Sequence, residues 1–201
     1  MLQRLLRHSS VYEASRRLIG ATREMERLVG EFVRPAPGMT LLDIGCGNGR
    51  LVPFLPEVAY VGVDHNQSYI DDAQSRYAGP TVRFICGDLG EFPADSIGPF
   101  DVAVSIGVLH HLDDTTAQRA IADTRERLKP GGRLITMDPC FEPGQRQIAR
   151  VLMALDRGKF VRHPTDYQRL LDDGTVDVEA VVLHDVYAFP YTHLVTQSIV
   201  R

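Results

Sequence analysis

The stretch LLDIGCGNGR, residues 41–50, places glycines at positions 45, 47 and 49 directly after a short apolar run. Glycine has no side chain and tolerates positive φ, so a glycine-rich turn between a strand and a helix lets the backbone approach a ligand closely. The spacing departs from the dinucleotide fingerprint GxGxxG, because Arg50 stands where its third glycine belongs. The lysine followed by Ser or Thr of a phosphate-binding P-loop is also missing. The stretch therefore predicts a ligand-binding turn behind a buried strand and disfavours NAD and nucleoside triphosphates.

The chain continues as apolar segments separated by helical or polar stretches. The segments are rich in Val, Ile and Leu and lack polar alternation, which is typical of strands buried on both faces. They are TLLDIG (40–45), AYVGVD (59–64), VRFICGD (82–88), FDVAVSI (100–106) and GRLITMD (132–138). This pattern predicts an α/β fold with a parallel sheet and helices on both faces.

Both ends of the chain depart from this succession of strands and helical stretches. VEAVVLHDV (178–186) and YTHLVTQSIV (191–200) have no room for a crossover helix between them, so we expect two strands paired antiparallel at one edge of the sheet. Before Pro35, apolar residues recur at helical spacing from Val11 to Phe32. We expect residues 1–34 to form a helical cap on a single domain of residues 35–201.

The composition is that of a globular domain that handles a small molecule. The 201 residues are 44% apolar and 24% charged, which suits one core. A net charge of −4 argues against a nucleic-acid partner, and no apolar run reaches the roughly 18 residues of a membrane span. Three cysteines without metal-ligand spacing favour a reducing cytoplasm and no metal site. The start, MLQRLLRHSS, is a poor secretory signal, although its arginines and serines overlap with an organellar transit peptide.

Two carboxylates follow strands on the edge where open α/β sheets bind ligands. Asp64 closes the second strand, 17 residues beyond Gly47, where an acidic side chain can accept both hydroxyl hydrogens of a ribose. Asp88 ends the third strand and is placed to accept a hydrogen bond from an exocyclic amine such as that of adenine. The ligand is therefore expected to carry an adenosine.

Five motifs together resemble those of the class I S-adenosylmethionine-dependent methyltransferases. They are, in order over about residues 36–138, LLDIGCGNGR, VGVD, ICGDLGEF, FDVAVSIGVLHHLDD and LKPGGRLITMD. One such motif is weak evidence, but five in register are specific. The resemblance implies a Rossmann-like, seven-stranded, mostly parallel sheet with an antiparallel last strand. It also implies S-adenosyl-L-methionine as cofactor and S-adenosyl-L-homocysteine as product.

The same resemblance implies a set of cofactor contacts. The glycine turn would line the methionine part, and the segment after the fourth strand would pass beneath the sulfonium. The set is Asp43, Gly45, Cys46, Gly47, Asp64, His65, Asp88, Leu89, Ser105, Ile106 and Gly107. A structural role is the alternative for two of these residues. Asp43 would stabilise the turn with its carboxylate, and Cys46 would be a small residue in a tight turn.

Methyl transfer requires few catalytic side chains. Methyl transfer from a sulfonium is an in-line displacement with a good leaving group, so positioning supplies most of the catalysis. A hydroxyl acceptor must also lose a proton, for which histidine is the best-tuned side chain at neutral pH. The motif VLHHLDD offers His110 and His111. We expect His111 to be the base, with His110 as the alternative and structural packing as the other role open to each.

The segment after the fifth strand is expected to form the other wall of the acceptor pocket. Glu142, Arg162 and His163 lie there. Tyr12 of the cap is a candidate to close over the cofactor, with packing at its helical spacing as the alternative. Arginines recognise carboxylates and phosphates, which favours an anionic or sugar-phosphate acceptor, although a solvated helix face needs no ligand.

Three functional hypotheses follow. The first is methyl transfer to a small molecule, most plausibly an O-methyltransferase of secondary or sugar metabolism. The alternative is a cofactor-binding module without turnover, with a regulatory role, and a third is an NAD-dependent oxidoreductase, weakened by the displaced glycine. Base methylation is disfavoured because the fourth strand ends in SIGVLHH rather than an NPPY-like motif. The acceptor and the oligomeric state are not specified by the sequence.

Overall fold

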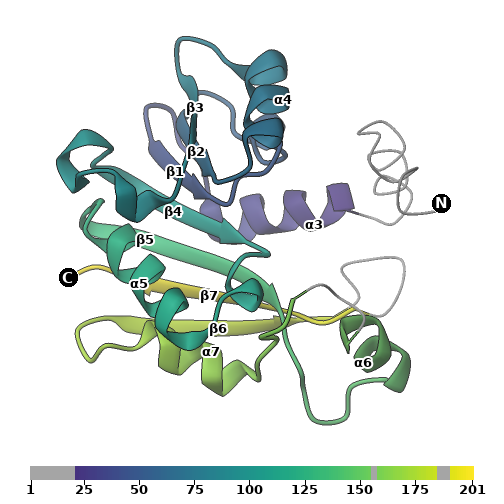
Figure 1. Cartoon of the computed structure of the whole chain (residues 1–201). Coiled ribbons are helices and arrows are strands. Elements are labelled where there is room, and N and C mark those ends of the chain that lie inside the picture. The colour runs from purple at the N-terminus through teal and green to yellow at the C-terminus, as the bar shows by residue number, and fades with distance from the viewer. Residues whose placement is uncertain (1–20, 155–157, 185–190) are drawn as a thin grey trace.

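The computed structural model describes residues 21–154, 158–184 and 191–201 (Figure 1). The strands are β1 (Thr40–Ile44), β2 (Ala59–Asp64), β3 (Val82–Cys86), β4 (Phe100–Ile106), β5 (Leu128–Pro139), β6 (Asp177–Leu183) and β7 (His193–Ile199). The α-helices are α3 (Ala21–Leu28), α4 (Gln67–Tyr77), α5 (Asp114–Arg125), α6 (Gln147–Ala154) and α7 (Pro164–Leu171). Short helical turns are η1 (Val29–Val33), η2 (Val52–Phe54), η3 (Leu89–Glu91), η4 (Ala94–Ser96) and η5 (Leu109–His111). Within these residues no helix is both long and apolar enough to cross a membrane.

The seven strands form one sheet in the order β3-β2-β1-β4-β5-β7-β6. Strands β1 to β5 pair in parallel, whereas β7 is antiparallel to both β5 and β6. The α/β class, the parallel core and the antiparallel tail predicted from the sequence are therefore confirmed. The tail strands pair with each other as expected, and β7 lies between β5 and β6.

Strand β5 is longer than predicted. The sequence predicted a strand over residues 132–138, yet β5 begins at Leu128, which pairs with Phe100 of β4. The register shifts between Phe100 and Val102, and this irregularity accommodates the Pro-Gly-Gly residues within the strand. At its far end β5 reaches Pro139, opposite His193 at the start of β7.

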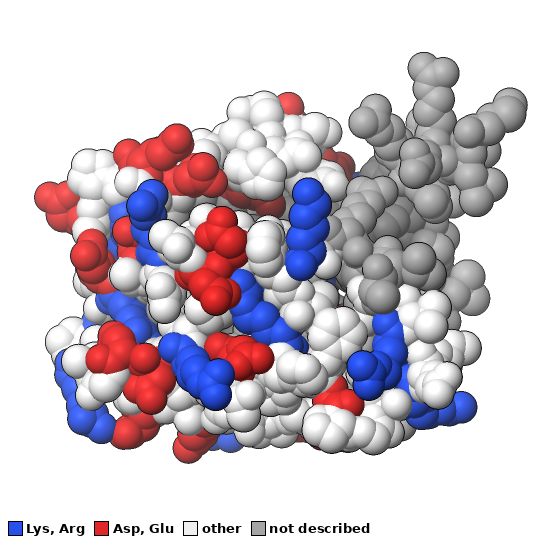
Figure 2. Space-filling model, turned by 60° about the horizontal axis from the view of Figure 1, so that its bottom comes forward, with Lys and Arg blue, Asp and Glu red and all other residues white. Residues whose placement is uncertain are grey.

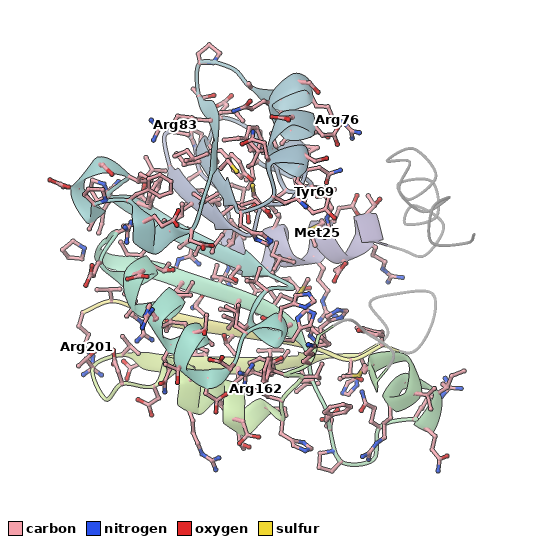
Figure 3. All side chains as sticks on the ribbon, in the orientation of Figure 1. Met25, Tyr69, Arg76, Arg83, Arg162 and Arg201 are labelled. Carbon is pink, nitrogen blue, oxygen red and sulfur yellow. The ribbon has the colours of Figure 1, made fainter. Side chains whose placement is uncertain are left out.

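Helices cover both faces of the sheet, as predicted. On one face α3 and α4 contribute Met25, Leu28 and Ile70 to a buried cluster with β1 and β4 (Figures 1 and 3). On the other face α5 and α7 contribute Ile121 and Tyr167 to a second cluster. The central strands β1 and β4 are buried from both sides, which explains why their sequences lack polar alternation. In the edge strand β6, exposed and half-buried residues alternate.

The described part of the N-terminal segment is helical, as its periodicity predicted. Helix α3 runs into η1, and Arg34 ends it with a φ of 50° just before Pro35. The segment preceding α3, with Tyr12, lies outside the described residues.

The strand order reverses direction between β1 and β4. In open α/β sheets the crevice beyond the carboxyl ends of the strands at such a switch point is where ligands bind. Here the glycine turn follows β1 and the histidine pair follows β4. The fold thus brings together the two motifs that the sequence keeps about 60 residues apart.

Candidate functional site

The three glycines of the turn after β1 have different surroundings. All three have positive φ, between 54° and 77°. A Cβ on Gly45 would lie 2.4 Å from Val108 Cγ2, and one on Gly49 would lie 3.1 Å from the Phe84 ring. A Cβ on Gly47 would meet nothing within 4 Å. Gly45 and Gly49 are therefore required by packing, whereas Gly47 borders open space that a ligand can fill.

Asp64 organises the turn from the end of β2. Its Oδ2 accepts the Gly47 N–H at 2.9 Å and its Oδ1 accepts the Asn66 N–H at 2.8 Å. Asn66 in turn caps the N-terminus of α4. Each carboxylate oxygen has a second acceptor position. The side chain can therefore hold both the loop and the two hydroxyl groups of a ribose.

Asp43 is buried beneath the same turn. Its Oδ2 accepts a hydrogen bond of 2.7 Å from the Tyr60 hydroxyl. Burial raises the pKa of Asp43 to about 7; the Tyr60 hydrogen bond opposes this rise and the nearby Asp64 charge adds to it. Cys46 packs beside this pair, and burial also raises the pKa of its thiol, which favours the reading of a small structural residue.

The predicted adenosine contacts lie beyond β2 and β3. Asp88 is exposed and closes a capping box with Glu91 at the start of η3, while Leu89 is buried. The His65 ring is exposed, with Nδ1 3.8 Å from Asp64 Oδ1. Asp88 and His65 are therefore accessible to a ligand held by Asp64.

The next predicted cofactor residues are Ser105 and Ile106, which end β4, and Gly107, which follows them. Ser105 is buried, and its side chain lines a small internal cavity together with Thr124 and Thr136. Any contact of Ser105 with a cofactor therefore involves its backbone. Ile106 is half-buried, and Gly107 turns with a φ of 69° after donating its N–H to Met137 of β5.

His110 forms a buried pair with Asp138 at the end of β5. The two side chains are 6% and 1% exposed, and Nδ1 of His110 lies 2.8 Å from Asp138 Oδ1. The same oxygen accepts the His110 backbone N–H at 3.1 Å. The imidazole Cε1 is 3.7 Å from the position of a Cβ on Gly107, and Gly158 packs on the opposite side of the ring.

His111, the expected base, has a different environment. It is exposed, and its ring centroid lies 4.0 Å from that of His110, with the two ring planes tilted by 40°. Both histidines stay candidates, and the His110 ring is oriented by its bond to the Asp138 carboxylate. Asp138 was missed by the sequence analysis. The signal was present, because the predicted strand over residues 132–138 ends at Asp138 just as β2 ends at Asp64.

Arg162 lies between α5 and α7 (Figure 3). Its guanidinium donates to the carbonyls of Leu109, Leu112 and Phe160 and twice to Asp114. These bonds occupy all five N–H groups of the side chain. The structure thus gives Arg162 the role of tying the η5 loop in place, and the predicted acceptor contact would require it to exchange one of these bonds.

The other predicted acceptor residues lie near the start of β7. Glu142 borders a cavity of about 340 Å³, and its Oε2 is 3.3 Å from Nε2 of His184. His163 is exposed and its Nδ1 is 2.7 Å from the Phe141 carbonyl oxygen, just before α7. The cavity is lined by Glu142, Pro143, Gly144, Gln145, Arg146, Ala149, His184, Tyr191 and Thr192.

Comparison with known proteins agrees with this geometry. Residues 41–132 match the methyltransferase domain family. The O-methyltransferase rstn1 of Aspergillus nomiae is 31% identical over 132 residues, which are 62% of this chain and 57% of that protein. The tRNA (carboxymethyluridine(34)-5-O)-methyltransferase ALKBH8 of Macaca fascicularis is 36% identical over 109 residues, which are 52% of this chain and 15% of that protein. The chain therefore spans less than two thirds of the length of each relative.

The fold is shared along the whole chain with a solved structure. Magnesium protoporphyrin IX methyltransferase from Synechocystis PCC 6803, solved with bound SAH, has a TM-score of 0.71 at 18% identity, covering 100% of this chain and 99% of that one. The domain match at residues 41–132, the sheet order and the glycine turn support a class I S-adenosylmethionine-dependent methyltransferase. The cofactor of this class, S-adenosylmethionine, fits the open space at Gly47 and the acceptor oxygens of Asp64.

Proposed function

We propose that the protein transfers a methyl group from S-adenosylmethionine to a hydroxyl oxygen of a small molecule. The observation that carries this proposal is the buried His110–Asp138 pair between the cofactor segment at Gly107 and the acceptor side of the sheet. A base oriented by a carboxylate is what a hydroxyl acceptor needs and what a thiolate or free amine acceptor does not.

In this proposal the predicted cofactor residues bind different parts of S-adenosylmethionine. The cofactor supplies a methyl group on a sulfonium, which leaves as a neutral thioether. Asp64 holds the ribose hydroxyls, and Asp43 lies beneath the turn that lines the methionine part. Asp88 and His65 contact the adenosine, and the backbone at Gly107 limits movement near the reacting carbon.

His110 moves the proton. In this proposal Nδ1 donates the hydrogen of the shared bond to the Asp138 carboxylate, so Nε2 is the basic nitrogen. Nε2 takes the hydroxyl proton while the oxygen forms its bond to the methyl carbon and the sulfur–carbon bond breaks. Asp138 stabilises the imidazolium that results. His111 contributes by packing on the ring of His110.

Two features favour a small acceptor over a nucleic acid. The cavity of about 340 Å³ near β7 is of the size that encloses a small molecule. On the face shown in Figure 2, acidic and basic side chains are interspersed and form no continuous basic stripe. The fungal O-methyltransferase relative supports this choice, and the tRNA methyltransferase relative supports the competing one. The three free thiols accord with the reducing cytoplasm proposed as the location.

Calorimetry and a product assay test the proposal. We expect S-adenosylmethionine to bind with a dissociation constant on the order of 1–100 μM. Incubation with methyl-labelled cofactor and a metabolite library should then label a small hydroxylated compound. Transfer of label to RNA instead would refute the small-molecule acceptor. Binding without any transfer would favour the alternative of a non-catalytic regulatory module.

A further inference from the structure

The cavity near β7 has a defined place beside the His110–Asp138 pair. Cys140, two residues after Asp138, donates its N–H to the Thr192 carbonyl at 3.1 Å. The Cys140 carbonyl accepts a hydrogen bond from Gln145 Nε2, which also bonds Thr192 Oγ1 at 2.9 Å. Thr192 and Gln145 both line the cavity. The cavity therefore adjoins the carboxyl end of the strand that carries Asp138.

The cavity is lined mostly by polar residues. Its acidic and basic side chains differ in whether another side chain neutralises them. The Glu142 carboxylate faces His184 at 3.3 Å, so its charge has a partner. Arg146 also lines the cavity and is exposed, and its guanidinium makes no hydrogen bond or ion pair with any other residue that the structure describes. The charge that is left without a partner in the cavity is thus positive.

We propose that this cavity is the acceptor subsite and that it binds a small hydroxylated compound through a carboxylate or phosphate held by Arg146. A guanidinium binds either anion through two parallel hydrogen bonds. Tyr191 supplies an aromatic wall, and Thr192 and Gln145 supply hydrogen-bonding groups at the floor. This inference rests on the proposed function, since it names the chemical class of its acceptor.

Matched pairs of probes test the inference directly. Binding of 4-hydroxybenzoate is compared with that of 4-hydroxybenzamide, and glucose 6-phosphate with glucose, by calorimetry in the presence of S-adenosylhomocysteine. The two pairs distinguish a carboxylate from a phosphate. We expect at least one anionic probe to bind about tenfold or more tightly than its neutral counterpart, which corresponds to about 1.4 kcal/mol. Equal binding within both pairs would overturn the inference.

Two arginine variants test whether Arg146 causes the preference for the anionic probe. Arg146→Gln should remove the preference for the anionic probe and leave the affinity for the neutral probe and for S-adenosylhomocysteine unchanged. Arg150→Gln is the matched control, because Arg150 is exposed on α6, the helix that begins directly after Arg146, but does not line the cavity. A preference that survives Arg146→Gln, or that Arg150→Gln removes equally, contradicts the inference. If Arg146-dependent binding is found but no acceptor is ever methylated, the proposed function fails and the anion site stands.

Discussion

Oδ1 of Asp138 binds His110 twice, through Nδ1 at 2.8 Å and through the backbone N–H at 3.1 Å. The carboxylate therefore fixes both the ring and the η5 turn that carries it. Its second oxygen, Oδ2, is buried and has no hydrogen-bond partner within the described residues. An unsatisfied buried acceptor lowers the stability of the fold by about 1–3 kcal/mol. A purely structural role for the pair does not explain why this cost is retained.

The first prediction concerns the His110 ring. His110→Gln keeps similar size but cannot act as a base, so turnover of the acceptor should fall by roughly 10²–10⁴. The dissociation constant for S-adenosylmethionine should stay the same, because no predicted cofactor contact is removed. Steady-state kinetics and calorimetry measure the two quantities on one preparation.

Two further variants serve as controls for His110. His111→Gln should change turnover only a few-fold, because the His111 ring is exposed and packs against the ring of His110, the proposed base. Asp138→Asn should lower turnover, because the amide favours the wrong imidazole tautomer. Loss of activity in His111→Gln with full activity in His110→Gln would exchange the two assignments.

The strands were predictable from local sequence, because their burial on both faces leaves an uninterrupted apolar run. The sequence boundaries of β2 and β4 agree with the structure to the residue. The carboxylates after β2 and β3 were also found, since the ends of parallel strands share one edge. Asp138 carried the same signal and was overlooked.

Other parts of the site depend on contacts between distant residues. The pairing of His110 with Asp138 spans 28 residues, and the bonds of Arg162 to the η5 loop span about 50. No periodicity or motif encodes such contacts. Sequence reasoning therefore placed Arg162 among surface arginines facing a ligand, whereas packing buries its guanidinium against backbone carbonyls.

The second prediction concerns Asp64. Asp64→Ala removes the ribose contact and the two backbone hydrogen bonds from Gly47 and Asn66. Loss of a hydrogen bond to a charged group costs about 1.5–3 kcal/mol, so cofactor affinity should fall ten- to hundredfold. Calorimetry with S-adenosylhomocysteine gives the value. An unchanged dissociation constant would show that the ribose is held elsewhere.

The third prediction separates the ligand role of Gly47 from its backbone role. Gly47→Ala strains a residue at φ 54°, at about 1–2 kcal/mol, and places a methyl group in the open space of the site. Gly38→Ala is the matched control, because Gly38 has φ 80° and open surroundings at the opposite end of β1. Both variants should lose similar stability on thermal unfolding. Only Gly47→Ala should weaken cofactor binding, and equal binding in the two would remove Gly47 from the site.

The fourth prediction is a pH dependence caused by Asp43. Its folded-state pKa of about 7 exceeds the unfolded value of about 3.9, so the folded chain binds the additional proton between these pH values. The free energy of unfolding should therefore fall as pH rises from about 4 to 7, by up to about 4 kcal/mol at 1.36 kcal/mol per pH unit. Asp43→Asn keeps an acceptor for the Tyr60 hydroxyl and should flatten this dependence. Denaturant titrations at pH 5 and 8 compare the two proteins, and parallel pH profiles would contradict the assignment.

The fifth prediction concerns Arg162 as a positioning residue. Arg162→Lys keeps the charge but has three donors in place of five, so backbone carbonyls of the η5 loop lose their partners. We expect a stability loss of about 2–4 kcal/mol from buried acceptors left unpaired. Turnover should also fall while cofactor affinity is retained, because the loop carries His110 and not the ribose site. Asp114→Ala provides the control, since it removes an exposed ion-pair partner and leaves the carbonyl bonds of Arg162 intact. If Asp114→Ala lowers turnover as much as Arg162→Lys, the ion pair rather than the carbonyl bonds positions the loop.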